Sequence, residues 1–475
     1  MSKTVWQITS LICFTSLFLL QPSGVSAADH SRSADAQALA VEKDKDGNIR
    51  PEILVGPIDL HRKYRSMEGP YVIQKLKVAD LVASKRVQLP GGMIVYLDPN
   101  KTAPSMAGAM ASTATPGPGD RVKKDPLLDD GKSPIGLADS SDKERELYWF
   151  KGIKLVVLDE NDKPMPTAEF ICHMNLDVDQ VARFASFPDL ERTGNLRIMT
   201  LTQGQTEFNF PDGYAVPVAS DETWTFTFQA ANRTTDEHRR LKHLCTLTFV
   251  KDSDLKKPLK ALHWFNPYIA VQVGSPEEIP EHKGPSCMIH SSAGNAPNMV
   301  PDTNFKGPSG KILTGHWSVP PGRHTYRIPV TTEIDFDLAK EDRTIHAVWT
   351  HIHPCCVNTT LSACKDGETV FSVDSSTKFK GTGPELKKID NILSREGIKL
   401  RGGESYELKA TYDNPSKETL DSMVALGVFC ESKKFQKPDW AKIDASASAA
   451  ASASKTKSVP ESPSAASTGS SASAA

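Results

Sequence analysis

The chain has 475 residues, a formal net charge of −2 and 39% hydrophobic residues. This length allows two or three domains, each with a core of its own. The balanced charge lacks the basic excess typical of nucleic-acid binding and the acidic excess typical of a cation buffer. We therefore expect no nucleic-acid partner.

Residues 1–27 predict a secretory signal peptide. One lysine precedes an apolar run from about Ile8 to Leu20, and a small-residue cleavage site ends at Ala27. The run is too short to span a bilayer stably, and no later run reaches about 18 apolar residues. We therefore expect an exported protein without a membrane span, located in a periplasm, at a cell surface or in the medium.

Loss of the leader removes Cys13 and leaves seven of the eight cysteines. In an oxidising compartment this number predicts up to three disulfides and one odd thiol, with a pairing that spacing alone does not determine. Cys355, Cys356 and Cys364 are close in sequence, and we expect Cys364 to be bridged to one of the other two across a hairpin. The remaining cysteines are Cys172, Cys245, Cys287 and Cys430.

Two early stretches lack hydrophobic periodicity. Residues 28–64 are polar and charged, and we interpret them as a flexible N-terminal arm. A strand-like segment follows at residues 71–78. Residues 101–145 then lose all periodicity, which predicts a disordered insertion within the first domain.

From residue 146 onward, short segments of alternating β-branched and aromatic residues recur between turns rich in Pro, Gly, Asn and Asp. Only residues 390–397 look helical. This pattern favours an all-β fold over alternating βαβ units. We expect two consecutive antiparallel jelly-roll-like β-sandwich domains.

A charged, proline-containing link at residues 251–260 separates two strand-rich blocks of similar size. It predicts an N-terminal β-sandwich over residues 65–255 and a C-terminal one over residues 256–435. Residues 436–475 form an Ala/Ser-rich segment that cannot bury a core, so we expect a disordered tail, compatible with a spacer to a cell surface.

The segment IHAVWTHIHPCC contains a His-x-His pair in a predicted strand. His351 and His353 are two residues apart, so both imidazoles point to one face of the strand and can reach one ion. Imidazole is a ligand for copper, zinc and iron alike. His346 has the opposite parity and is expected to face away. The alternative is an ordinary pair of surface histidines.

The surroundings of this pair narrow the choice of metal. Upstream, GHWSVPPGRHTYRIPV has a Val-Pro-Pro-Gly turn that enters a strand, and Met423 lies about 70 residues downstream of His353. This arrangement resembles the C-terminal domain of the copper type II, ascorbate-dependent monooxygenases, the family of peptidylglycine α-hydroxylating monooxygenase and dopamine β-monooxygenase. In that family a His-x-His pair and a methionine about 70 residues later hold the oxygen-binding copper.

The resemblance implies a copper site formed by His351, His353 and Met423. The family methionine follows two acidic residues, which Asp421-Ser422-Met423 partly matches. A thioether favours Cu(I), whereas imidazole accepts both copper oxidation states. A methionine in a strand otherwise fills a core. Because Met423 shares its face with small side chains, we expect its sulfur to be half open to solvent.

The family also has a second, electron-transfer copper, held by an adjacent His-His pair and a third histidine. Here Cys172-His173 stands at the place of the pair, and Gln229 stands where the third histidine is expected. These departures put the second site in doubt. Cys172 and His173 need a β-bulge to converge on one ion, because adjacent residues in a strand point to opposite faces. His238 or His243 would be the third ligand if the alignment is shifted.

The resemblance implies an exported copper-dependent oxidoreductase of the monooxygenase type, which hydroxylates a C–H bond of an unknown small-molecule or peptide substrate with ascorbate or another external reductant. A non-catalytic copper-binding or copper-handling protein is the alternative, and a purely structural surface protein is a third. The sequence has no Gly-x-Ser-x-Gly elbow, phosphate-binding glycine loop or His-Glu-x-x-His helix that would compete with a copper chemistry.

Overall fold

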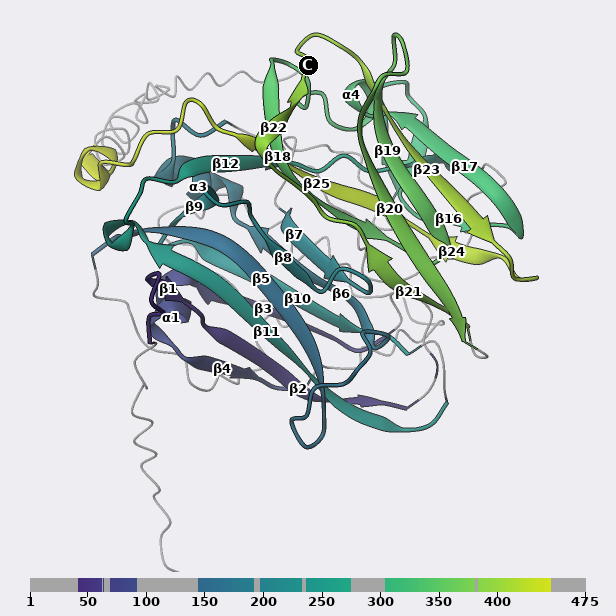
Figure 1. The fold of residues 1–475 in the computed structure, drawn as a ribbon, viewed down its shortest axis with the longest axis horizontal. Coiled ribbons are helices and arrows are strands. Elements are labelled where there is room, and N and C mark those ends of the chain that lie inside the picture. Colours follow the sequence, from purple (N-terminus) through teal and green to yellow (C-terminus); the bar gives the residue numbers. More distant parts are fainter. Residues whose placement is uncertain are drawn as a thin grey trace, which may run out of the picture. The chain divides into compact units, whose positions relative to one another are not determined.

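The computed structural model describes residues 42–61, 63, 69–91, 144–191, 197–232, 236–274, 304–380 and 383–445. Within these ranges the chain forms antiparallel sheets and a few short helices, so the predicted all-β sandwich class is confirmed (Figure 1). None of the helices in this part is long and apolar enough to cross a membrane. The predicted signal peptide, most of the predicted insertion and residues 446–475 of the predicted tail lie outside the described residues. Residues 436–445 are not a disordered tail as predicted, because residues 440–445 form a helical turn and Trp440 packs on Phe187.

One large sheet of eleven strands runs through the molecule. Its strands follow the order β22-β18-β25-β12-β9-β5-β11-β2-β4, with β1 paired to β11 and β8 paired to β5. The strands are β1 (Asn48–Ile49), β2 (Glu52–Leu60), β4 (Arg86–Leu89), β5 (Leu147–Asp159), β8 (Glu207–Asn209), β9 (Tyr214–Ala219), β11 (Arg239–Lys251), β12 (Lys260–Phe265), β18 (Arg343–Ile352), β22 (Ile392–Leu400) and β25 (Val424–Glu431).

A four-stranded sheet covers the N-terminal part of the large sheet. In β10, TWTFTFQA, every second residue from Trp224 to Phe228 is buried, as the alternating pattern predicts. The Trp224 ring packs against Phe150 of β5 at 5.3 Å and Phe249 of β11 at 5.5 Å, so aromatic side chains fill the first sandwich. The strand order is β3 (Tyr71–Lys77), β10 (Thr223–Ala230), β6 (Ile171–Val178) and β7 (Arg197–Thr202).

A five-stranded sheet covers the C-terminal part. The hydroxyl of Tyr412, on β23, donates to the carbonyl of Met423 beside β25 at 3.0 Å and so links the two layers. The strand order in this sheet is β17 (Gly322–Pro329), β23 (Tyr406–Asn414), β19 (Cys356–Ala363), β20 (Thr369–Lys380) and β21 (Gly383–Ile389). Two small sheets are separate from it. One pairs β16 (Trp317–Val319) with β24 (Leu420–Ser422), and the other pairs β15 (Ile312–Thr314) with β13 (Val271–Gln272) and β14 (Asn304–Lys306).

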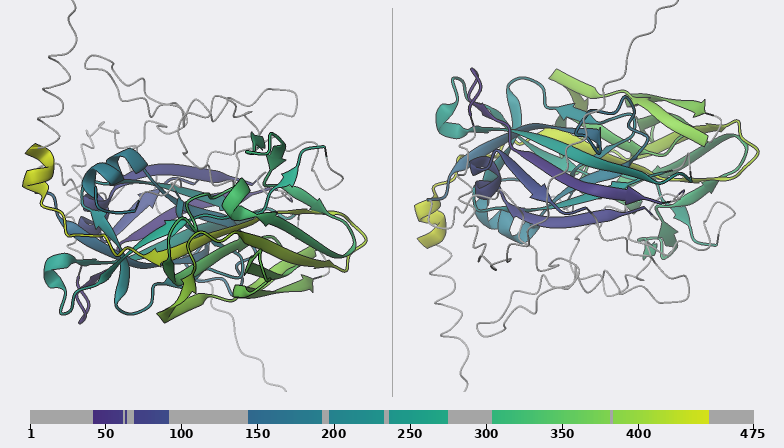
Figure 2. Two further views of the ribbon diagram at one scale, coloured as in Figure 1. Left: turned by 90° about the horizontal axis from the view of Figure 1, so that it is seen from above. Right: turned by 90° about the horizontal axis from the view of Figure 1, so that it is seen from below.

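The helices are short connections rather than structural layers. After β25 the chain returns to the N-terminal strands (Figure 2). There Phe435 packs on Trp149, and Trp440 packs on Phe187. The guanidinium of Arg145 lies 5.0 Å from the Trp440 ring centre. The helices are α1 (Val78–Ala83), α3 (Gln180–Ser186) and α4 (Val330–Glu333).

Three other predictions about organisation are wrong. The link at residues 251–260 does not separate two sheets, because β12 pairs in parallel with β9 and antiparallel with β25. The predicted arm over residues 28–64 contains β1 and β2, and β2 pairs with β11 in the large sheet. Residues 390–397 are not helical, since β22 pairs with β18 there and tertiary pairing overrides the local pattern.

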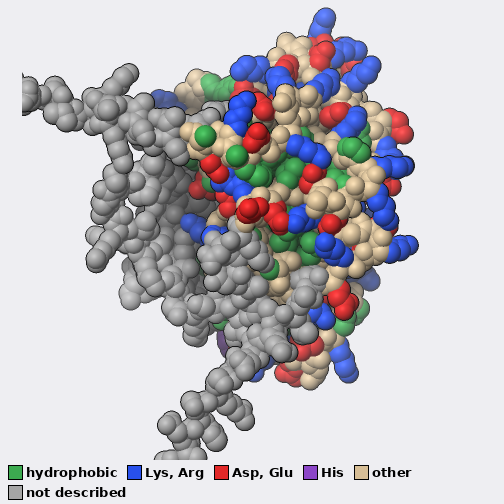
Figure 3. All heavy atoms as spheres, turned by 90° about the vertical axis from the view of Figure 1, so that its left-hand side faces the viewer, with side chains coloured by type: hydrophobic (Ala, Val, Ile, Leu, Met, Phe, Trp, Pro, Cys, Tyr) green, Lys and Arg blue, Asp and Glu red, His purple; other side chains and the backbone are tan. Residues whose placement is uncertain are grey.

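The surface carries mixed charge. On the face shown in Figure 3, Lys and Arg side chains alternate with Asp and Glu, and hydrophobic side chains occur in small separate groups. This face therefore shows no extended patch of one charge, in agreement with the net charge of −2.

Candidate metal centre

The strand register brings the three predicted copper ligands together. On β18, His351 lies opposite Ala425 of β25 and Ile352 lies opposite Val424. This is the last pair of the ladder, so His353 directly follows it at the end of β18 and Met423 directly precedes it at the start of β25. Strand alternation continued by one residue puts His353 and Met423 on the face of the large sheet that carries His351.

Small side chains on β25 make room for the rings of β18. Gly427 lies opposite Trp349, and a Cβ atom at Gly427 would stand 1.9 Å from the indole Nε1 atom. This Nε1–H donates to the carbonyl of Ile198 on β7 at 2.8 Å. The face that carries Trp349 and the His-x-His pair is therefore turned toward the four-stranded sheet.

All three residues are buried. The exposed fractions are 2% for His351, 3% for His353 and 1% for Met423. The expectation of a half-open Met423 sulfur is therefore wrong. The small residues that share its face accommodate neighbouring rings and do not mark an opening to solvent.

His353 has a carboxylate partner. Its Nδ1 atom lies 3.1 Å from Oδ2 of Asp421 and 3.2 Å from the carbonyl oxygen of the same residue. An imidazole oriented by a carboxylate at Nδ1 presents Nε2 as its second donor, an arrangement common among metal-binding histidines. The acidic residue two positions before Met423 thus orients the adjacent histidine.

His351 differs from His353 because its ring has no hydrogen-bond partner among the described residues. Burial lowers its pKa well below the ordinary value, and the neighbouring basic side chains of His353, His173, Arg197 and His316 lower it further. Neither ring nitrogen makes a hydrogen bond to any described residue. A buried nitrogen without a partner is costly, so the neutral ring is well suited to accept a metal ion as its partner.

Two other buried histidines adjoin the pair. The ring centre of His173, on β6, lies 6.1 Å from that of His351, which in turn lies 5.5 Å from that of His353. The ring of His316, just before β16, lies 6.4 Å from that of His353. The sequence reading overlooked His316, because it stands alone in GHWSVPPG and no spacing connects it with the His-x-His pair.

The residues of the proposed second site lie on β6 and β10. Gln229 pairs with His173, whereas Ala230 pairs with Ile171, so Cys172 is the extra residue of a β-bulge. The bulge that a Cys172-His173 site requires is therefore present. The Gln229 side-chain amide donates to the carbonyl of Gly69 at 3.2 Å and is engaged with the backbone.

The two substitute ligands lie elsewhere. His238 is exposed, and its Nε2 atom lies 3.0 Å from Oδ1 of Asp59. His243 lies on β11 and is fully buried, which lowers its pKa to about 4. His346 packs apart from the site, because it stacks on Tyr214 at 3.8 Å and its Nδ1 atom lies 2.8 Å from the carbonyl oxygen of Ser394. The pairing of β18 shifts between Ile345 and Ala347, so strand parity does not decide the face of His346.

The described residues contain no group of three or more His, Cys, Asp or Glu side chains whose donor atoms are arranged to hold a metal ion. A His₂Met set has only two such donors, so this observation does not bear on it. The donor chemistry at His351, His353 and Met423 fits copper, because two imidazoles and a thioether accept Cu(I) and tolerate Cu(II).

No disulfide joins the described cysteines to one another. The predicted bridge to Cys364 is wrong, because β19 (Cys356–Ala363) separates the cysteines as an extended strand. At about 3.3 Å per residue they stand roughly 25 Å apart, far beyond the reach of a disulfide. Burial raises the pKa of Cys356 to about 11, so its thiol stays protonated at neutral pH.

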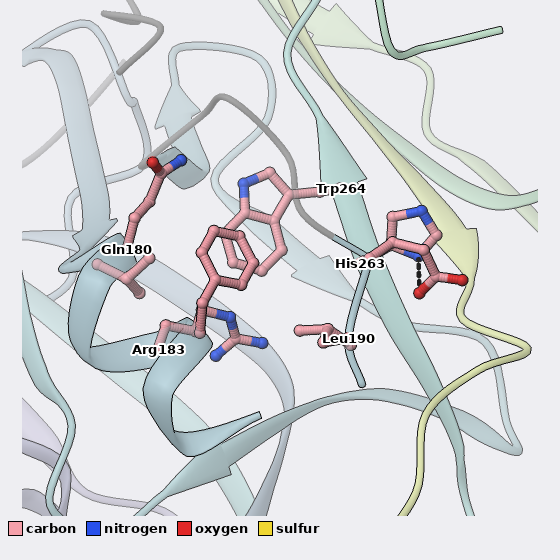
Figure 4. Close-up of a pocket in the computed structure, with 8 residues that line it drawn as sticks. Gln180, Arg183, Leu190, His263 and Trp264 are labelled. Carbon is pink, nitrogen blue, oxygen red and sulfur yellow. Dashed lines mark ion pairs between the residues drawn. The ribbon is translucent and has the colours of Figure 1, made fainter. Parts of the chain in front are cut away.

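A second group of buried charges surrounds a small pocket between α3 and β12 (Figure 4). Arg183 forms an ion pair with Glu222 at 3.1 Å, and its guanidinium lies 4.9 Å from the Trp264 ring centre. His263 lies between Glu191 and Arg343, at 3.5 Å and 3.1 Å. These charges neutralise one another and connect neighbouring elements, so we assign them a structural role.

No family model matches the chain, and no curated protein matches it. Among solved structures, one chain from the atomic structure of Sulfolobus turreted icosahedral virus is 8% identical, with 61% of this chain and 54% of that chain covered, at a TM-score of 0.16. The match thus spans about half of the viral chain. A likeness at this score carries no argument about fold or function.

Proposed function

We propose that the protein is an exported copper-binding protein in which His351, His353 and Met423 hold one copper ion. One observation supports this proposal: His351 lies in the β18–β25 ladder, and His353 and Met423, which are 70 positions apart in the sequence, directly flank its last pair. Export rests on the predicted signal peptide at residues 1–27.

The donor set supports copper over harder metals. Thioether sulfur is a soft ligand that stabilises Cu(I), and a carboxylate-oriented imidazole such as His353 binds either oxidation state. Magnesium and calcium prefer oxygen ligands, which His351, His353 and Met423 do not offer. Zinc accepts imidazole and is therefore the competitor to test.

A second candidate function is the monooxygenase chemistry implied by the resemblance. It is supported by the same observation, because the three residues that the resemblance names lie in the β18–β25 ladder or directly beside its last pair. Copper would supply one-electron chemistry for O₂ activation, with an external reductant such as ascorbate. One oxygen atom would enter a substrate C–H bond, and the other would leave as water with two electrons and two protons.

Two observations make copper binding the leading proposal. The donor residues are at most 3% exposed, which gives a substrate little access to them in this conformation. Gln229 replaces the histidine expected in the electron-transfer site, and its amide is bonded to Gly69. Both features support a protein that stores or transfers copper.

Copper per chain tests the proposal. We expect one equivalent of copper after reconstitution and dialysis against a weak chelator, and we expect its loss in His351→Ala. His346→Ala is the matched control, because it removes another buried histidine from the same strand that stacks on Tyr214 rather than on the site residues. Copper retained by His351→Ala would refute the site.

Oxygen consumption separates the two candidate functions. If the protein stores or transfers copper, the copper-loaded protein mixed with ascorbate should consume O₂ no faster than the His351→Ala variant under the same conditions. Reductant-driven O₂ consumption that depends on His351 would instead favour the monooxygenase.

A further inference from the structure

We infer that His173 belongs to the same metal centre as His351 and His353, so that a single ion is held across the contact between the four-stranded sheet and the large sheet. This inference rests on the proposed copper site and extends it. It replaces the second, separate site with one centre to which both parts of the chain contribute a ligand.

Ring spacing is the first argument. Two imidazoles that share one ion, each with a nitrogen about 2 Å from it, have ring centres roughly 5 to 6.5 Å apart. The His173–His351 distance of 6.1 Å and the His351–His353 distance of 5.5 Å both lie in this range. His351 is therefore spaced from each of its two neighbours like a second ligand of one ion, and the 6.1 Å distance puts that ion nearly on the line between the His173 and His351 rings.

The contact that carries these rings is fixed by hydrogen bonds. Trp349 on β18 donates to the carbonyl of Ile198 on β7, and the N–H of Thr350 donates to Oε1 of Gln205 at 3.1 Å. On the next strand, His173 pairs with Thr202 of β7. The histidine of the four-stranded sheet is therefore held beside β18 by backbone pairing and by bonds between the sheets.

His351 supplies the second argument. Its two ring nitrogens are buried without a hydrogen-bond partner among the described residues, between a ring from each sheet. An ion bound here would satisfy one of these nitrogens. A fully apolar side chain would fill the same space without this cost, so the position is better explained by a ligand than by packing alone.

Two features oppose binding, and both have a remedy in the structure. Arg197 adds positive charge near His351, but its Nε–H donates to Asp177 at 2.8 Å. The donor nitrogens of the three rings are not arranged to hold an ion in this conformation, so the rings must turn about their Cβ–Cγ bonds to share one. This torsion is broad in histidine, so the rings can turn without leaving a favoured rotamer.

His316 is the competing third histidine, because its ring lies beside His353 at 6.4 Å, away from His173. Of the two, His173 is thus better placed to share an ion with the central ring. His316→Ala distinguishes these assignments.

The experiment measures Cu(II) affinity by chelator competition and counts nitrogen ligands by the superhyperfine pattern in electron paramagnetic resonance. We expect one equivalent with three nitrogen ligands in the unmodified protein. His173→Ala should lower the affinity at least about tenfold and remove one nitrogen, and His173→Gln, which keeps most of the volume, should do the same. His346→Ala should change neither quantity.

Other outcomes overturn the inference in distinguishable ways. Unchanged affinity and nitrogen count in both His173 variants would leave the copper proposal intact and remove His173 from the centre. Binding of two copper equivalents would establish separate sites if the His173 variants lose one equivalent and His351→Ala loses the other. Loss of a nitrogen in His316→Ala but not in His173→Gln would assign the third ligand to His316. No copper at all would refute the proposed function itself.

Discussion

Gly427 lies opposite Trp349 in the β18–β25 ladder, with the indole packed where any side chain at position 427 would begin. Replacement of Gly427 by Ala should force Trp349 to move, since a Cβ atom would stand 1.9 Å from its Nε1. Overpacking of this kind costs roughly 1 to 3 kcal/mol. Urea unfolding should show this loss, and copper affinity should fall because Trp349 and His351 share one strand face. Unchanged stability would contradict the packing.

Met423 should discriminate between the oxidation states of copper. Met423→Leu keeps the buried volume but removes the sulfur, so we expect Cu(I) affinity to fall more than Cu(II) affinity. Competition with Cu(I)-specific and Cu(II)-specific chelators measures the two constants. An equal decrease in both would mean that the residue acts through packing, and no change would remove it from the site.

Asp421→Asn tests the orientation of His353. The variant loses the carboxylate that lies 3.1 Å from Nδ1, so metal affinity should fall about 10- to 100-fold while the apoprotein stays folded. Asp413→Asn is the matched control, because Asp413 lies on a nearby strand but pairs only loosely with Arg323 at 3.7 Å. Equal effects of the two substitutions on affinity would argue against a specific role for Asp421.

Asp335 should make stability depend on pH. Burial and the neighbouring Asp337 raise the pKa of Asp335 to about 7 in the folded protein. The unfolded chain ionises this group near pH 4, whereas the folded chain keeps it protonated up to about pH 7. Its contribution to the free energy of unfolding therefore decreases as the pH rises from about 4 to about 7 and then stays constant.

Asp335→Asn removes this pH-dependent contribution. Relative to the unmodified protein, the variant should gain stability between pH 4 and pH 8, by at most about 4 kcal/mol from a shift of about three pKa units. Urea unfolding at pH 4, 6 and 8 gives the difference at each pH. A difference that does not change with pH would mean that Asp335 ionises normally in the fold.

Local pattern predicted the strand class and the His-x-His geometry. β10 alternates as expected, and the strand period predicts that His351 and His353 share a face. The period does not determine the face of His346, because the pairing of β18 shifts between Ile345 and Ala347. The resemblance added Met423, which no local rule connects with residues about 70 positions away. The β18–β25 ladder ends at Ile352 and Val424, the residues next to His353 and Met423.

The rest depends on contacts between distant parts of the chain. Nothing within residues 48–60 shows that β2 will be paired with β11, and nothing near His173 shows that it will meet His351. The burial of Met423 was also unpredictable, because small neighbours on a strand look alike whether they leave space for solvent or for a ring. Such features are set by which strands become neighbours.

The position of β12 determines how the protein can be divided. Since this strand is paired on one side with β9 and on the other with β25, a cut before it would leave β9 without its neighbour, and a cut after it would leave β25 as an exposed edge. Exposed edges of this kind recruit strands from other molecules. Fragments that end near residue 260 are therefore expected to aggregate when produced separately, and the chain is best handled as one indivisible unit.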